Sequence, residues 1–211
     1  MQNAYALISL KPTMFKPLIA ISALIIASIS IAQTAQPMRL RATIEKVEPG
    51  SITVKDRSGE VVTLLMASDL SVTEVYLIDI AEIKADSYVG AAATPGKDGT
   101  LDAVEVLVFP AAMRGAGEGH RPWDLMPEAT MTNAAVDGIR SSANGRTLKL
   151  KYKDGEKTLN VPMNVPIVTI KPGDNSLLVM GAKLIVMAEV RDGKPTATRI
   201  LAGRNGFVPP M

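Results

Sequence analysis

The chain has 211 residues, no cysteine, few aromatic residues (4%) and a formal net charge of +2 at pH 7. The lack of cysteine excludes disulfides and thiolate chemistry, so the folded part must be held together by its hydrophobic cores alone. Proteins that bind single-stranded nucleic acids stack the bases on exposed aromatic side chains, so the scarcity of aromatic residues argues against a nucleic-acid partner.

The N-terminal segment has the pattern of a signal peptide. Lys11 and Lys16 precede the uncharged apolar run 17–32, and the small residues Ser30 and Ala32 favour cleavage after Ala32. As an uncleaved anchor the run would be short, because about 20 apolar residues are needed to cross a bilayer. We therefore expect export to the periplasm and no membrane span after cleavage. Loss of the two lysines also leaves basic and acidic residues in balance.

The residues that follow the leader read as short β-strands. Leu40, Ala42 and Ile44 alternate with polar residues, and Pro49-Gly50 and Ser58-Gly59 mark turns. Alternation with a period of two between turn residues is typical of half-buried antiparallel strands. We predict strands near residues 40–45, 51–55, 61–66, 72–76, 88–94 and 101–109, with a short helix near 78–84.

The turn motifs recur in the second half of the chain. Residues 57–60 (RSGE) resemble 153–156 (KDGE), and residues 97–100 (KDGT) resemble 191–194 (RDGK). The matching glycines are 96 and 94 residues apart, and such nearly constant spacing indicates a duplicated module.

We therefore predict a mainly β protein with two small antiparallel β-barrels in tandem, similar to the oligonucleotide-binding (OB) fold. Closing a small sheet into a barrel hides its edges, although a single large sandwich is an alternative architecture. Asp174 would cap a short helix in the second module. The predicted segments are a signal peptide at 1–32, a first module at 33–109, a Gly/Pro-rich connector at 110–131, a second module at 132–205 and a C-terminal tail at 206–211.

The two predicted modules carry opposite charges. Residues 39–109 hold seven basic and twelve acidic residues, whereas residues 132–205 hold twelve basic and six acidic residues. Opposite charges attract over about 10 Å at ordinary ionic strength. We expect the modules to dock on each other, or chains to associate head to tail.

The connector holds the only histidine and the only tryptophan of the chain. In a first interpretation it is a structural clasp, with Trp123 buried in the seam between the barrels, the two arginines paired with acidic residues, and His120 bonded to a loop carbonyl. The same residues could instead bind a ligand or partner at the seam. These candidate binding residues are Arg114, Glu118, His120, Arg121, Trp123 and Asp124.

A metal site is the second interpretation of the connector. His120, Glu118 and Asp124 could act as ligands, joined by Met113, Met126 or Met131 if the ion were monovalent copper. One imidazole without a thiolate makes a poor tight site for zinc unless two chains share the ion.

A row of lysines is a candidate anion-binding face. Lys149, Lys151 and Lys153 alternate with Leu148, Leu150 and Tyr152, so the ammonium groups should lie on one face of a strand. A solvated sheet face, or an edge strand whose lysines prevent unwanted pairing, explains the same pattern without a ligand.

Motifs of known catalytic sites are missing from the sequence. It contains no Gly-x-Ser-x-Gly elbow, no metalloprotease helix and no phosphate-binding glycine motif, and His120 would have to act as the sole base. We therefore expect a protein that is not an enzyme and needs no cofactor.

The segment FPAAMRGAGEGHRPWDLMPEATMTNA, the later GRTLKLKYKDGEK and the closing GFVPPM resemble a group of exported bacterial proteins. These proteins carry duplicated small β-barrel domains of unknown function, and some bear an automatic label of metal ABC transporter permease. A permease needs several membrane-spanning helices, whereas only the leader is long and apolar here.

The sequence thus favours a periplasmic binding or assembly module that acts through the seam on an envelope protein or small ligand. A periplasmic metal-handling accessory that uses His120, and an enzyme of unrecognised type, are the alternatives.

Overall fold

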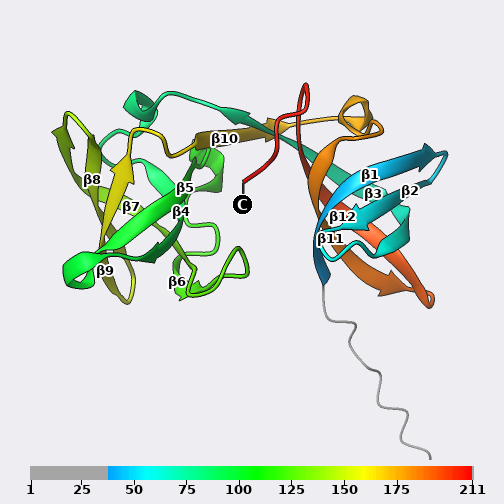
Figure 1. Ribbon diagram of the computed structural model, residues 1–211, viewed down its shortest axis with the longest axis horizontal. Helices are drawn as coiled ribbons and strands as arrows, with labels where there is room; N and C mark the ends of the chain where they lie inside the picture. The colour runs from blue at the N-terminus through cyan, green and yellow to red at the C-terminus, as the bar shows by residue number, and fades with distance from the viewer. Residues whose placement is uncertain (1–37, 211) are drawn as a thin grey trace, which may run out of the picture. The chain divides into compact units, whose positions relative to one another are not determined.

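The computed structural model describes residues 38–210, and these form a mainly β fold, as predicted. Its regular structure consists of twelve strands, β1 to β12, and four single turns of 3-10 helix (Figure 1). Within residues 38–210, no helix is long and apolar enough to cross a membrane. The predicted signal peptide and its cleavage site lie outside the described residues.

Five strands close into a first ring. Each pairs with the next in the order β1, β2, β3, β12, β11, and β11 returns to β1. All these pairings are antiparallel except β12 with β3, which is parallel. The fully buried side chains of Ile52, Val54, Leu64 and Ile200 fill its interior. The strands are β1 (Met38–Glu48), β2 (Ser51–Asp56), β3 (Val61–Leu77), β11 (Lys183–Arg191) and β12 (Lys194–Gly203).

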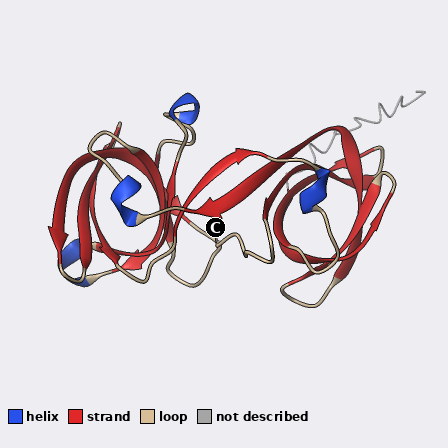
Figure 2. Ribbon diagram, turned by 90° about the horizontal axis from the view of Figure 1, so that it is seen from above, coloured by secondary structure: helices blue, strands red, loops and turns tan. Residues whose placement is uncertain are grey.

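Five other strands close into a second ring in the order β4, β5, β9, β8, β7. Again one pairing, β5 with β9, is parallel. Val89, Leu148, Leu150 and Leu159 are fully buried inside this ring. Figure 2 shows the strands curling into these closed arrangements. The strands are β4 (Tyr88–Pro95), β5 (Leu101–Val108), β7 (Thr130–Ser142), β8 (Gly145–Tyr152) and β9 (Gly155–Pro162).

The rings do not coincide with the predicted modules 33–109 and 132–205. β11 and β12 come from the second half of the chain but close the ring of β1 to β3, whereas β4 and β5 come from the first half and close the ring of β7 to β9. The two halves therefore exchange a pair of strands. The alternating pattern could not predict this, because both copies present the same pattern and either pair of strands fits either ring.

Two further strands join the rings to each other and to the connector. β10 (Ile167–Pro172) pairs with the C-terminal part of β3 on one side and with β5 on the other. β6 (Gly119–Pro122) adds to the edge of β7. The predicted strands near 61–66 and 72–76 are one long strand, β3, because β12 pairs along its length and bridges the polar residues in the middle with a register shift.

The duplication is visible in matching turns. The Asp79 carboxylate accepts a hydrogen bond from the backbone of Ala81, and 95 residues later the Asp174 carboxylate accepts one from Ser176. Each caps a single 3-10 turn, η1 (Ile80–Glu82) and η4 (Asn175–Leu177). The cap predicted at Asp174 is therefore present.

The short helix predicted near 78–84 is reduced to the single turn η1. The chain leaves η1 in an extended conformation at Ile83, and this side chain is buried in the core of the second ring. Leu178 follows η4 and is buried in the core of the first ring in the same way. Each turn therefore ends where an apolar side chain enters a ring.

We expect the two rings to unfold in one cooperative transition, because opening either ring withdraws strands that both halves of the chain share. In differential scanning calorimetry the calorimetric and van't Hoff enthalpies should agree. Leu64→Ala in the first ring and Leu159→Ala in the second should each destabilise this single transition by about 2–5 kcal/mol. Two resolved transitions, each sensitive to only one substitution, would contradict the expectation.

Candidate functional site

The connector packs against the second ring through backbone and side-chain contacts. The carbonyl of Ala116 accepts hydrogen bonds from the Asn133 amide (2.9 Å) and the Tyr88 hydroxyl (3.4 Å). Arg114 donates to the backbone and carboxylate of Asp86, an acidic residue of the predicted first module. Glu118 accepts a hydrogen bond from the backbone N–H of Lys153 (2.9 Å).

The far end of the connector contacts the first ring through Asp124. Its carboxylate receives two hydrogen bonds from Arg41 on β1, at 2.8 and 3.0 Å, and lies 3.5 Å from the Arg39 guanidinium. The hydrogen bond from Arg41 is the main cause that lowers the pKa of Asp124 below its ordinary value. The connector therefore supplies an acid to bases of the first ring, the reverse of the pairing predicted for Arg121, which instead donates to the carbonyl of Gly117.

Trp123 is the second contact between connector and first ring. The Arg39 guanidinium lies 4.0 Å from the centre of its ring, and that of Arg121 lies at 5.4 Å. The side chain is half-buried rather than fully buried as predicted, and its indole N–H has no hydrogen-bond partner among the described residues. Trp123 thus joins the two rings through stacked cations.

We expect Trp123→Ala to lower the free energy of unfolding by about 1–3 kcal/mol, because a half-buried ring leaves a smaller cavity than the 3–5 kcal/mol of a fully buried one. Trp123→Phe keeps an aromatic face for Arg39 and should lose clearly less. Urea unfolding followed by circular dichroism measures both. Equal losses for the two variants would show that the stacked cations contribute nothing.

The three predicted metal ligands do not come together. His120 shares a hydrogen bond with the Thr132 hydroxyl (2.8 Å), Glu118 bonds to Lys153, and Asp124 bonds to Arg41. Burial, with a smaller effect of nearby Lys157, lowers the pKa of His120 below its ordinary value. No group of three or more His, Cys, Asp or Glu side chains in the described part of the chain is arranged to hold an ion. Of the three, only His120 lies in β6, where it pairs with Thr132 of β7, whereas Glu118 precedes this strand and Asp124 follows it.

Two of the three predicted lysines, Lys149 and Lys151, share the exposed face of β8, whereas Lys153 lies in the turn that follows the strand. Lys149, Lys151 and Lys153 are exposed, while Leu148 and Leu150 are buried. Lys149 is paired with Glu156 on β9 at 3.0 Å. Because β8 pairs with β7 and β9, it is not the edge strand that one interpretation proposed.

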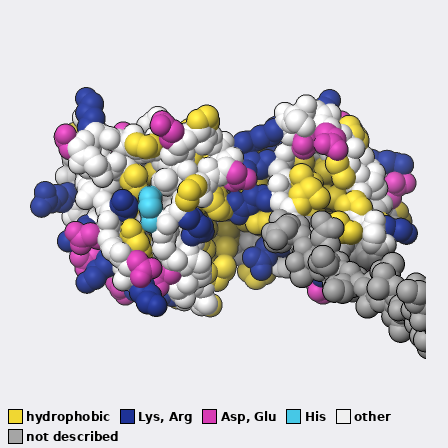
Figure 3. Space-filling model, turned by 90° about the horizontal axis from the view of Figure 1, so that it is seen from below, with side chains coloured by type: hydrophobic (Ala, Val, Ile, Leu, Met, Phe, Trp, Pro, Cys, Tyr) yellow, Lys and Arg dark blue, Asp and Glu magenta, His cyan; other side chains and the backbone are white. Residues whose placement is uncertain are grey.

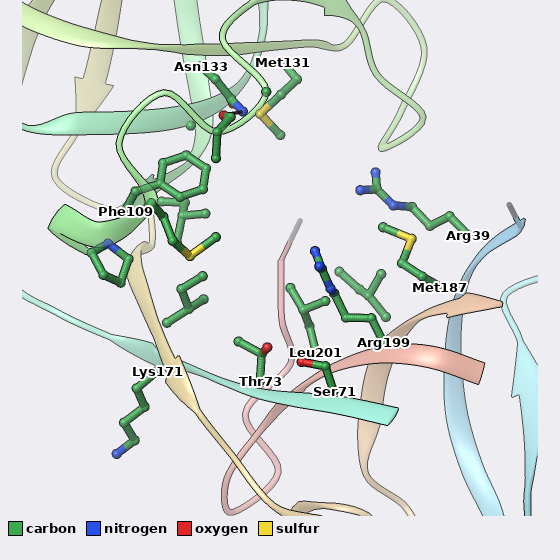
Figure 4. Close-up of a pocket in the computed structure, with 18 of the residues that line it drawn as sticks. Arg39, Ser71, Thr73, Phe109, Met131, Asn133, Lys171, Met187, Arg199 and Leu201 are labelled. Atoms are coloured by element: carbon green, nitrogen blue, oxygen red, sulfur yellow. Dashed lines mark hydrogen bonds between the residues drawn. The ribbon is translucent and has the colours of Figure 1, made fainter. Parts of the chain in front are cut away.

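A pocket of about 630 Å³ lies between the outer faces of the two rings (Figure 4). On the first ring, Arg39, Met187, Arg199 and Ser71 are successive cross-strand neighbours on β1, β11, β12 and β3. The adjacent row on the same face contributes Ile185, Leu201 and Thr73 to the lining. On the second ring, the lining includes Leu107, Gly90, Asn133 and Met131.

β10 contributes Ile170, Lys171 and Pro172 to the lining of this pocket, and the connector, with Phe109 just before it, forms a further wall. Phe109, Met113, Ala116 and Gly117 line it, together with Arg121 and Trp123. Of the six predicted binding residues, only these last two reach the pocket. Arg114, Glu118, His120 and Asp124 lie outside its lining.

The charged side chains that line the pocket are all basic. They are Arg39, Arg121, Lys171 and Arg199, and the lining contains neither aspartate nor glutamate. Burial is the main cause that lowers the pKa of Arg39. Figure 3 shows lysine and arginine side chains beside hydrophobic ones in the hollow at the middle of the view.

Asn133 places an unused polar atom at the pocket. Its side chain is only 6% exposed, its amide donates to Ala116, and its carbonyl oxygen has no hydrogen-bond partner among the described residues. A Cβ on Gly90 would lie 2.9 Å from that oxygen and 3.1 Å from the Phe109 ring. Only glycine leaves room for this approach. A buried acceptor without a partner costs free energy, so a ligand N–H or O–H that reached it would be favoured.

Glu105 on β5 is a second buried polar group at the seam, and sequence reasoning missed it. It is 1% exposed and makes no hydrogen bond with a described residue. Desolvation raises its pKa to about 8, and the charge of Arg41 acts in the opposite direction. The carboxyl group is therefore protonated in the folded protein at neutral pH.

We expect Glu105→Gln to gain stability relative to the wild type as the pH rises. Below about pH 4.3 the carboxyl group is neutral in both folded and unfolded chains. Between that value and about 8, the unfolded chain ionises first, so the wild type loses stability while the amide variant does not. Each pKa unit corresponds to about 1.4 kcal/mol, so the difference should reach a few kcal/mol and level off above pH 8.

Urea unfolding at a series of pH values measures this difference, with exposed Glu60→Gln as the control. A difference between Glu105→Gln and the wild type that stays constant from pH 4 to 8 would contradict a neutral Glu105.

The pocket had a sequence signal that the predictions did not use. The runs around Leu107 (VEVLVF), Ile185 (KLIVMA) and Leu201 (RILAG) are apolar on both faces of a strand rather than alternating. Such continuous runs indicate strands buried on both sides, as at a seam.

Comparison with known proteins adds no assignment. No protein-family model matches the chain, and neither a curated protein nor a solved structure is similar to it at a significant level.

Proposed function

We propose that this chain is an exported, periplasmic binding module without catalytic activity, whose ligand occupies the pocket at the seam. Export rests on the predicted signal peptide. Each of the two closed rings has a 3-10 turn followed by an apolar side chain that is buried in its core. This shared arrangement supports a pair of OB-like barrels derived from a duplicated module.

The observation that carries this proposal is the pocket itself. Its volume of about 630 Å³ falls in the range of small-molecule sites, and its lining is mostly apolar with a few polar groups. Much of its lining comes from backbone-paired strands of both rings. Two lining residues also carry a buried polar atom without a hydrogen-bond partner among the described residues, the Asn133 carbonyl oxygen and the Trp123 indole N–H.

The polar groups at the pocket favour binding over catalysis. They are three guanidinium groups, the Lys171 ammonium, the Asn133 amide, the Trp123 indole N–H and the hydroxyls of Ser71 and Thr73, which can hold and orient a ligand. His120, the only imidazole of the chain, bonds to Thr132 outside the lining. The hydrogen bonds from Arg41 to Asp124 attach the connector to the first ring and so help to hold the wall that the connector forms.

Native mass spectrometry of protein purified from the periplasm of an expressing bacterium tests the proposal. The chain should begin at Gln33 and carry a non-covalent small molecule at near-stoichiometric occupancy. Ser71→Phe places a ring in the pocket from an exposed position and should reduce occupancy at least about tenfold. Thr63→Phe, also exposed on β3 but outside the pocket, is the matched control.

Wild-type protein without bound material, or with equal occupancy in both variants, would overturn the binding function. A chain that retains residues 1–32 would overturn export.

A further inference from the structure

The pocket has an apolar part and a basic part that lie side by side on the first ring. Ile185 and Leu201 form one cross-strand row, and Met187 and Arg199 form the row two residues along the same strands. Side chains two residues apart point to the same face of a strand, at a spacing of about 7 Å. A ligand that crosses these rows meets aliphatic carbon first and a guanidinium group next.

Arg199 is the cation that is available to a ligand. Its side chain is exposed and points into the pocket in Figure 4, and no hydrogen bond or ion pair joins it to another described residue. A guanidinium group can donate two parallel hydrogen bonds to a carboxylate or phosphate, which a neutral head group cannot accept as well.

The other basic residues of the lining are partly engaged. Arg39 stacks on Trp123 and lies 3.5 Å from Asp124, and Arg121 donates to Gly117. Lys171 lies near Glu74 at 3.6 Å and over the Tyr76 ring. They therefore bias the pocket toward anions, while Arg199 provides the direct contact.

On the side opposite this basic part, the second ring and the connector line the pocket with apolar side chains. Leu107, Phe109, Met113 and Met131 line that side, and Leu107 belongs to the apolar cluster that continues to Ile185 beneath the pocket. Unbranched thioethers adapt to ligands of varied shape. A small inorganic anion would leave this surface uncovered.

We infer that the ligand is a small amphipathic anion, an alkyl or acyl chain with a single carboxylate or phosphate head. The chain lies on Leu107, Ile185 and Leu201, and the head binds Arg199. The assignment of this ligand class rests on the proposed binding function.

Titration of the ligand-free protein, complete except for the cleaved signal peptide, with four compounds of equal chain length tests this inference. The compounds are decanoate, decyl phosphate, decanol and decyltrimethylammonium, each below its micelle concentration. Fluorescence of Trp123, the only tryptophan and a lining residue, reports binding, and calorimetry confirms it. One or both anions should bind at least about tenfold more tightly than decanol, and the cation should not bind, because a hydrogen bond to a charged group is stronger than one between neutral groups.

Two variants separate the head from the chain. Arg199→Gln should weaken the anions about tenfold or more and leave decanol unchanged. Arg140→Gln, a substitution of an exposed arginine on β7 outside the lining, should change neither. Ser71→Phe should weaken the anions and decanol together.

Equal affinity of decanol and the anions, or no effect of Arg199→Gln, would overturn the ligand class but leave the binding function standing if Ser71→Phe still blocks binding. Absence of binding by all four compounds would also overturn the class. The occupancy seen by mass spectrometry decides the binding function separately. The relative affinities of decanoate and decyl phosphate distinguish a carboxylate source from a phosphate source.

Discussion

The exchange of strands between the two halves of the chain is the constraint on which the rest of the structure depends. β11 and β12 complete the first ring, β4 and β5 complete the second, and β3 and β10 carry the chain across. Since neither half contains a complete ring, the rings cannot separate as beads on a string would. Their outer faces are held opposite each other by the backbone itself.

The seam combines two kinds of interaction that act in different places. Val75, Leu107, Val168 and Ile185 form an apolar cluster between the ring cores, where burial of carbon provides the stabilisation. At the connector, the Asp124 contacts with arginine are partly exposed, so they contribute less free energy and more to positioning. The pocket is the part of the seam that neither the apolar cluster nor the connector fills.

Local features of the fold could be predicted from the sequence, whereas the pairing of the strands could not. Alternation around Ile44, Val54 and Leu148 predicted strands, and Asp174 predicted a cap, because these signals depend on neighbouring residues only. Which strands pair is decided by contacts between residues over a hundred positions apart. Two similar repeats also give two nearly equivalent solutions.

The candidate site divides along the same line. Arg121 and Trp123 were predicted because they stand out in the connector, and both line the pocket. Arg39 and Arg199 belong to ordinary-looking strands, and only the exchanged pairing makes them cross-strand neighbours of Met187. Glu105 lies in the predicted strand near 101–109, and nothing in the local pattern marked this glutamate as a buried one.

The exchange also fixes an order of events during folding. β1 and β3 leave unsatisfied edges that only β11 and β12 can cover, and these strands begin more than a hundred residues after β3 ends. Contacts of such high sequence separation slow folding, because the loop entropy is lost before the contacts form. Until β11 and β12 pair with these edges, the same strands of another copy of the chain fit them equally well. The protein concentration during refolding therefore selects between a closed monomer and interlocked chains.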